Sequence, residues 1–166
     1  MNSERFDMSS ALDRELNEAI VNADISNSYE EFLAIIDRYY AENVEVASDT
    51  TPASLTGKAH VLPILFNFLM PLHVMAEIGG LSVTLRYSPI RADQREEQYT
   101  EWSLDLEGIL GRSVTVYWSS ARRWKGSRVS YERHFDHRQI GGPLTFIDLG
   151  LDGVPAPACQ YQALLR

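Results

Sequence analysis

The hydrophobic pattern of the chain changes from a helical period to a strand period about halfway along its length. Apolar residues recur at helical spacing from a serine cap at residue 9 or 10 to about residue 22. A second helical run spans about residues 28–43. It begins with Ser28 and has Glu31 three residues later, which is the capping-box pattern at a helix start. The first part of the chain therefore predicts two amphipathic helices.

A third helix is predicted from Gly57 to about Leu69, after a short strand at residues 44–46. Pro63 lies inside this stretch, and proline removes a backbone donor from a helix. We therefore expect the third helix to start late or to kink at Pro63.

From Ala76 onward apolar and polar residues alternate, which is typical of strands with one buried face. One strand is predicted at residues 81–88 and a second at 99–106. Two more form a hairpin over residues 113–136, with a turn at Lys125-Gly126-Ser127. Helices followed by about four long antiparallel strands predict an α+β domain with the helices on one face of the sheet.

The 166 residues suffice for one domain with its own core. We expect a frayed N-terminus at residues 1–9 and the folded domain at residues 10–138. Residues 139–166 are rich in glycine and proline, and we expect a tail that packs on the domain or on a neighbouring subunit.

The formal net charge of −8 argues against nucleic acid as a partner, because nucleic-acid binding requires neutralisation of phosphates. The N-terminus has no apolar stretch of a secretory signal, and the apolar run at residues 61–75 is too short and too polar to span a membrane. The single Cys159 cannot form an intramolecular disulfide, which fits a reducing compartment. These features predict a soluble cytoplasmic protein.

The second strand of the hairpin has two faces of opposite character, and only one can point inward. The apolar set is Val129, Tyr131, Arg133 and Phe135, and the polar set is Ser130, Glu132, His134 and Asp136. Hydrophobicity alone favours the first set as core, with the second as a solvated face paired to Arg122. In the other interpretation the polar set lines a small-molecule pocket with Trp118, Ser120 and Arg122.

If Trp124 faces Arg128 across the turn, Trp118 lies opposite His134 and Ser120 lies opposite Glu132. The other face then pairs Tyr117 with Phe135 and Ala121 with Tyr131, which would make a plausible dimer surface.

Three local motifs resemble the nuclear transport factor 2-like superfamily, which includes SnoaL-like polyketide cyclases and ketosteroid isomerases. They are Tyr-Tyr-Ala-Glu-Asn-Val-Glu-Val at residues 39–46, Leu-Thr-Gly-Lys at 55–58, and Arg-Trp-Lys-Gly-Ser-Arg-Val at 123–129 leading into a strand that ends in Phe135-Asp136. In order, they span about residues 10–138. The resemblance implies a curved sheet wrapped around about three N-terminal helices, forming a cone with a small-molecule pocket, and a homodimer formed through the outer sheet face.

The resemblance also implies site residues. The pocket-facing positions of the last strand fall on the polar set above, and the acid/base aspartate of the cyclases falls on His134. Asp24 stands where dehydratase relatives have an aspartate, while Glu77 replaces their histidine and His73 lies one helical turn earlier. The two carboxylates of the steroid isomerases are missing: their positions fall near Ser48, with Asp49 beside it, and near Ser120.

We therefore predict an enzyme of the lyase, isomerase or cyclase kind that acts on a small apolar or aromatic carbonyl compound. His134 would be the acid/base, oriented by Glu132, with Asp24 or Glu77 as a second polar group. Trp118 would be a stacking wall. Ser120, Arg122 and Asp136 would also contact the substrate.

Proton transfer needs no cofactor. We expect no metal site, since strand alternation separates His134 from His137. The alternative function is a non-catalytic dimeric module that binds a ligand or assists assembly.

Overall fold

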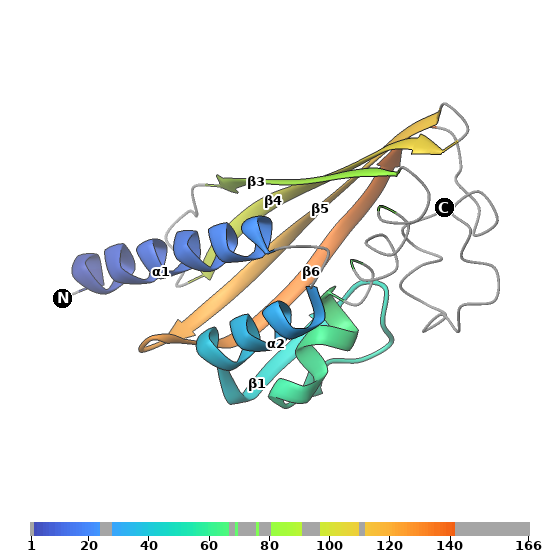
Figure 1. Cartoon of the computed structure of the whole chain (residues 1–166). Coiled ribbons are helices and arrows are strands. Elements are labelled where there is room, and N and C mark those ends of the chain that lie inside the picture. The colour runs from blue at the N-terminus through green and yellow to red at the C-terminus, as the bar shows by residue number, and fades with distance from the viewer. Residues whose placement is uncertain are drawn as a thin grey trace.

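The computed structural model describes residues 2–23, 28–66, 69, 76, 81–90, 97–109 and 112–141, without the side chains of 2–7, 28, 109 and 112. The elements in chain order are α1 (Asn2–Asn22), α2 (Ser28–Tyr39), β1 (Tyr40–Ser48), β2 (Leu55–Thr56), η2 (Lys58–His60), η3 (Leu62–Phe66), β3 (Ser82–Ile90), β4 (Glu97–Ile109), β5 (Arg112–Lys125) and β6 (Arg128–Ile140). Figure 1 shows long, curved strands with α1 and α2 on one side of the sheet.

The six strands form one open sheet in the order β2-β1-β6-β5-β4-β3. Strands β3 to β6 form the predicted antiparallel meander. The sheet as a whole is mixed rather than antiparallel, because β1 pairs with β6 in parallel. After β1 and β2 the chain crosses to β3 at the opposite edge of the sheet. Strands β4, β5 and β6 then follow in order back towards β1, so β6 lies beside β1 and runs in the same direction. The α+β class and the curved sheet are as predicted.

The two predicted helices are present with different ends. Helix α1 begins at Asn2, well before the expected serine cap. Helix α2 ends at Tyr39 and β1 begins at Tyr40, whereas the sequence predicts a helix to about residue 43. Tyr40 pairs with Val129 of β6, so pairing in the sheet replaces the last helical turn.

The third helix is irregular, as the proline predicts. Lys58–His60 forms a 3₁₀ turn, and Leu62–Phe66 forms a short π-helix that contains Pro63. Proline has no N–H for the regular helical bond, and a wider turn accommodates that loss. Within this segment Leu62, Leu65 and Phe66 are buried.

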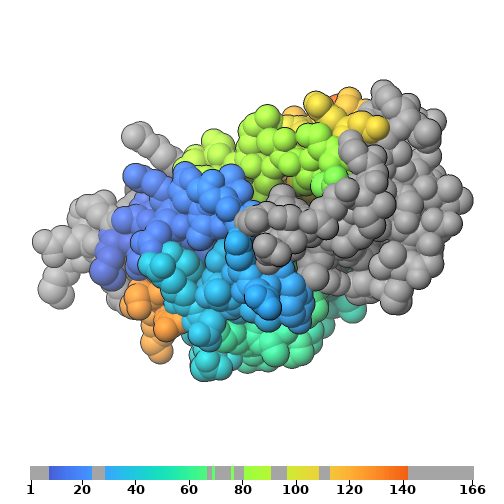
Figure 2. Space-filling view, viewed as in Figure 1, coloured from blue at the N-terminus to red at the C-terminus, as the bar shows by residue number. Residues whose placement is uncertain are grey.

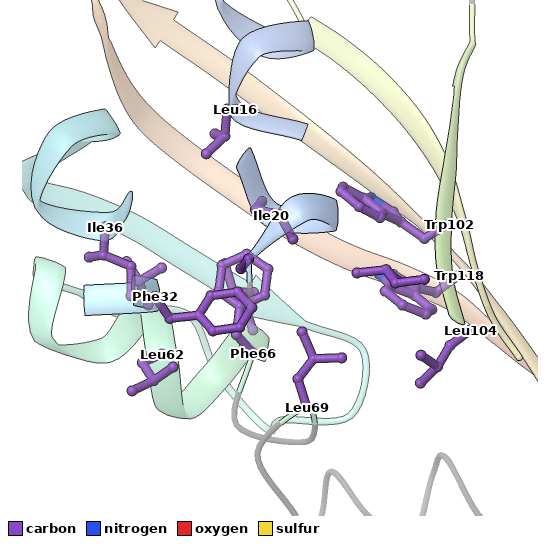
Figure 3. Packing of buried hydrophobic residues seen from close by; sticks show 14 of the residues in the cluster. Leu16, Ile20, Phe32, Ile36, Leu62, Phe66, Leu69, Trp102, Leu104 and Trp118 are labelled. Atoms are coloured by element: carbon purple, nitrogen blue, oxygen red, sulfur yellow. The ribbon is translucent and has the colours of Figure 1, made fainter. Parts of the chain in front are cut away.

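The core lies between the helices and the concave face of the sheet. On β4 the predicted alternation is confirmed: Trp102, Leu104 and Leu106 are buried, and the residues between them are half-buried. From the helical side Phe32 stacks on Phe66 with ring centroids 5.6 Å apart. Figure 3 shows Phe32 and Phe66 directed from the helical segments towards the sheet. In Figure 2, α1 and α2 cover one side of the molecule.

Strand β6 continues to Ile140, past the predicted end at Asp136. The tail expected at residues 139–166 lies, from residue 142 on, outside the described residues. In the described part of the chain, no helix is long and apolar enough to cross a membrane.

Candidate active site

The polar face of β6 points into the molecule. Glu132 is fully buried and His134 is 2% exposed, while Tyr131 and Phe135 are only half-buried on the other face. Of the two interpretations of this strand, the one based on hydrophobicity alone is therefore wrong. Val129 is also buried, because the pairing of β5 with β6 shifts between Arg123 and Trp124.

The predicted inner face of the hairpin is correct, but its pairing is not. Trp118, Ser120 and Arg122 are all buried on the same side as Glu132 and His134. The structure places Arg122 opposite Glu132 and Ser120 opposite His134. The predicted pairs, Trp118 with His134 and Ser120 with Glu132, are thus two residues out of register. The observed turn pairs Lys125 with Arg128, and the shift that follows it moves the register further.

Asp136 does not join Glu132 and His134 in the interior, which corrects a second expectation. Its φ of 56° interrupts the strand alternation, and its side chain is exposed. The next residue, His137, is turned inward instead and stacks on Trp118, with ring centroids 6.2 Å apart and ring planes 10° apart. The expected separation of His134 from His137 across the strand is therefore also wrong, because a bulge at Asp136 lies between them.

Three groups from three strands surround the Glu132 carboxylate. The Tyr40 hydroxyl on β1 donates to Oε2 over 2.5 Å, and the His134 Nε2 atom lies 2.8 Å from Oε1. The Arg122 Nε atom forms an ion pair with Oε2 at 3.0 Å. Burial raises the pKa of Glu132, but the charge of Arg122 and the contact with His134 outweigh it and lower the pKa to about 2. Glu132 is therefore ionised at neutral pH.

The guanidinium of Arg122 also binds helix α1. Its Nη1 atom lies 3.3 Å from Asp13 Oδ1 and donates to Asn17 Oδ1. Asp13 in turn accepts a hydrogen bond of 3.0 Å from the Trp124 indole. Burial lowers the pKa of Arg122. The charges of Glu132 and Asp13 raise it by more than burial lowers it, so the net shift is upward. One cation thus joins the helix to the sheet through two buried carboxylates.

Tyr40 keeps its proton in this environment. Burial and the neighbouring Glu132 charge both raise the pKa of its hydroxyl well above its ordinary value. The hydroxyl is therefore a hydrogen-bond donor throughout the neutral range. Arg122 Nη2, by contrast, has no hydrogen-bond partner among the described residues.

An aromatic row runs across the concave face beside this polar cluster. Trp102 stacks on Trp118 with ring centroids 6.0 Å apart, and Tyr87 packs against Trp102 at 5.8 Å. Figure 3 shows the two indoles side by side. The Trp102 indole N–H donates a hydrogen bond of 2.9 Å to Ser120 Oγ, which fixes the position of the Ser120 hydroxyl. Trp118 is one member of a continuous aromatic layer.

Apolar groups cover the ring of His134. Phe66 of η3 meets it edge-on with centroids 5.8 Å apart, and Trp118 lies 6.3 Å away. Hydrogen bonds and charge interactions of His134 are stronger in such surroundings than in water, because little water competes for them.

The other predicted residues of the site, Asp24 and Glu77, lie outside the described residues, as does His73. Their place beside His134 stays a prediction.

Sequence reasoning missed the polar residues that helix α1 and strand β1 contribute. Asp13 and Asn17 interrupt the apolar stripe that carries Leu16 and Ile20, and polar residues on a buried helical face are a signal that was available. Tyr40 had no such signal, since an aromatic residue at the start of a strand is ordinary core.

No family model matches the chain, and no curated protein matches it. Solved structures do. A Jannaschia sp. CCS1 protein named as a SnoaL-like polyketide cyclase has a TM-score of 0.51 at 10% identity, over 75% of this chain and 85% of its own. A Bacillus subtilis protein named as an isomerase has a TM-score of 0.51 at 13% identity, over 89% and 96%.

A Xanthomonas campestris pv. campestris protein named as a polyketide cyclase also has a TM-score of 0.51, at 16% identity, over 82% of this chain and 93% of its own. Identities this low show a shared fold alone and do not indicate which reaction, if any, is shared. The chain shares the fold of these solved structures, one of which is named as SnoaL-like, and this is the fold that its motifs predict.

Proposed function

We propose that this protein is a cofactor-independent small-molecule enzyme that transfers protons on an apolar or aromatic carbonyl compound, in the manner of a lyase, isomerase or cyclase. His134 is the general acid/base and Glu132 orients it. The observation that carries the proposal is the buried contact of 2.8 Å between His134 Nε2 and Glu132 Oε1.

The contact determines which ring nitrogen would react. An ionised carboxylate can only accept hydrogen bonds, so the His134 Nε2 atom that faces Glu132 carries a proton. Nδ1 is then the basic atom of the neutral ring. In the proposed step Nδ1 takes a proton from the carbon beside the substrate carbonyl, and the C–H electron pair forms the enolate. The imidazolium returns the proton to another atom of the enolate, so no electrons are gained or lost.

The imidazolium that this step creates lies against a buried carboxylate. The His134 Nε2 atom is 2.8 Å from Glu132 Oε1, and both side chains are buried. The positive ring therefore forms beside an ion-pair partner that is already in place.

The names of the structural neighbours are compatible with this broad reaction type. Two are named as polyketide cyclases and one as an isomerase. The substrate and the direction of the reaction rest on the proposal alone.

A second function has a specific observation in its favour. The three contacts of Glu132 come from the protein itself, as in an ion-pair network that serves only the fold. In that case the protein is a non-catalytic module that holds a ligand or assists assembly, and His134 is a structural residue.

Hydrogen exchange separates the two functions. A panel of enolisable aromatic and aliphatic ketones is incubated with the protein in D₂O, and loss of the α-hydrogen signal is followed by proton NMR. We expect exchange above the buffer rate for at least one ketone, lost in His134→Ala and retained in the control His60→Gln. Full exchange by the His134→Ala variant, or no exchange of any ketone, contradicts the enzyme.

We further propose that the protein is a cytoplasmic homodimer, assembled through the outer face of the sheet. Arginine–aromatic pairs on this face support the proposal. Arg123 lies over Tyr131 with its guanidinium carbon 4.6 Å from the ring centroid, and Arg133 lies over Phe135 at 4.5 Å. Both residue types are enriched at protein interfaces. Sedimentation velocity should give twice the chain mass, and a monomer at tens of micromolar protein contradicts the dimer.

A further inference from the structure

A second pair of a carboxylate and an imidazole lies next to the first. The Asp49 Oδ1 atom is 2.5 Å from the His137 Nδ1 atom. Asp49 directly follows β1, whose last residue Ser48 pairs with His134 of β6. The backbone N–H of Asp49 also donates to the His134 carbonyl over 3.0 Å. The end of β1 therefore holds both histidines in place.

The bulge in β6 places the two imidazoles on the same side of the sheet. In a regular strand, residues separated by three positions lie on opposite faces. The positive φ of Asp136 breaks that rule, and both rings contact the same indole: His134 and His137 lie 6.3 Å and 6.2 Å from Trp118, centroid to centroid. Trp118 is thus a common neighbour of two histidines with different carboxylate partners.

The two pairs differ in exposure to solvent. The His134 and Glu132 side chains are at most 2% exposed, whereas the side chain of His137 is 9% exposed and that of Asp49 is 41% exposed. The outer pair therefore reaches water while the inner pair does not. Exchange of the His134 proton with solvent would need a path to water, and the outer pair is the part of the site that reaches water.

The environment keeps His137 able to accept a proton. Burial lowers the pKa of His137, and the charge of His134 acts in the same direction, while the charges of Asp49 and Asp136 raise it. The net shift is downward, so the ring is neutral at neutral pH. With Nδ1–H donated to Asp49, its basic atom is Nε2.

We propose that His137, oriented by Asp49, is a second proton-transfer residue that acts on the same ligand as His134. The proposal rests on the proposed function. It narrows the substrate of that function to an enolisable carbonyl compound that exchanges protons with the site at its α-carbon and at its carbonyl oxygen. His134 Nδ1 takes the proton from the α-carbon. His137, after it has accepted a proton from solvent at Nε2, donates that proton to the carbonyl oxygen. The C–H bond, the N–H bond of His137 and the C=O π bond break, while the N–H bond of His134, the O–H bond and the C=C bond form. Both rings return to their starting states when the enol is reprotonated at carbon and loses its O–H proton.

The histidine titrations test the two-histidine arrangement without any substrate. Protein labelled with ¹⁵N-histidine is titrated by long-range proton–nitrogen NMR as the wild type, Asp49→Asn, His134→Gln and the control His60→Gln. Loss of the Asp49 charge should lower the midpoint of His137, and loss of His134 should raise it. The control should leave it unchanged. A His137 midpoint that moves in neither variant overturns the arrangement.

The role in proton transfer is tested with 2-tetralone, a flat ketone with acidic α-hydrogens. We expect His137→Gln to slow its hydrogen exchange in D₂O at least tenfold and to remove one limb of the pH–rate profile, with the fold confirmed by circular dichroism. Asp49→Asn should shift that limb rather than remove it. Wild-type rate and profile in His137→Gln overturn the role.

The two experiments separate the two proposals. If the wild type exchanges no ketone, the proposed enzyme fails, and coupled NMR titrations would then show only a paired-histidine site. If the wild type exchanges 2-tetralone and His137→Gln does so equally well, the enzyme stands and the role of His137 fails.

Discussion

Arg122 and Glu132 lie opposite each other on β5 and β6, with 3.0 Å between Nε and Oε2 and neither side chain more than 1% exposed. This relationship explains why β6 buries its polar face. A carboxylate removed from water requires a charged partner, and the inner face of β5 supplies one. The same guanidinium reaches Asp13 on α1, so the pair also fixes the helix against the sheet.

Loss of the cation should destabilise the protein more than loss of its partner. Arg122→Met leaves the carboxylates of Asp13 and Glu132 buried without their arginine partner, and we expect a loss of about 3–5 kcal/mol in the free energy of unfolding. Glu132→Gln leaves Arg122 paired with Asp13 and should cost less. Urea unfolding at pH 7 measures both. Equal losses would show that the ion pair with Asp13 contributes nothing.

Protonation of Glu132 in acid should lower the free energy of unfolding by a predictable amount. Its pKa in the folded state is about 2, below its ordinary value of 4.5, so its ionised form stabilises the fold above about pH 5. This contribution falls away as the pH drops from 4.5 towards 2, by about 3 kcal/mol in all. Urea unfolding between pH 2 and 7 should show a flatter acid limb for Glu132→Gln than for the wild type. Parallel curves would contradict the lowered pKa.

Two adjacent tyrosines provide a matched pair of variants. Tyr40 donates to the buried Glu132, whereas Tyr39 donates to Glu15, whose side chain is 49% exposed. Tyr40→Phe should cost about 1.5–3 kcal/mol of unfolding free energy, because it removes a bond to a buried charge. Tyr39→Phe should cost less than about 1 kcal/mol. Thermal unfolding of the two variants side by side checks the difference, and a reversed order would refute it.

The bulge at Asp136 should tolerate glycine and reject β-branched residues. A φ of 56° is accessible to glycine and aspartate but is strained for valine. We expect Asp136→Gly to be close to neutral and Asp136→Val to cost about 1–3 kcal/mol. The His137 signals in NMR should shift in the valine variant, since the bulge turns that ring inward. Unchanged stability in Asp136→Val would mean that the strand adopts another path there.

Much of the fold follows from local pattern. The capping box at Ser28 and the helical spacing that follows it predict α2, and the alternation around Trp102 predicts the inner face of β4. Proline at position 63 predicts the break in the third helix. These features depend on neighbours a few residues away, so they can be recognised without any tertiary contact.

The site depended on contacts between distant residues. Tyr40 and Glu132 are 92 positions apart, and Arg122 and Asp13 are 109 apart. The predicted register of β5 and β6 was two residues wrong, because the pairing at the turn and the bulge beside it are local features that alternation does not encode. For the same reason Asp136 was expected inside and His137 outside, and the structure reverses both.

The amino-acid sequence was therefore enough to identify two opposite faces on β6, an inner face on β5 and the SnoaL-like order of elements. The choice between the faces of β6 came from the assembled sheet, and so did the surroundings of His134. The physical reason is that hydrophobicity ranks Tyr131 and Phe135 above Glu132 and His134 as core residues. That ranking is reversed when a buried arginine and a tyrosine hydroxyl compensate the charge of Glu132, and those groups meet Glu132 only after the chain has folded.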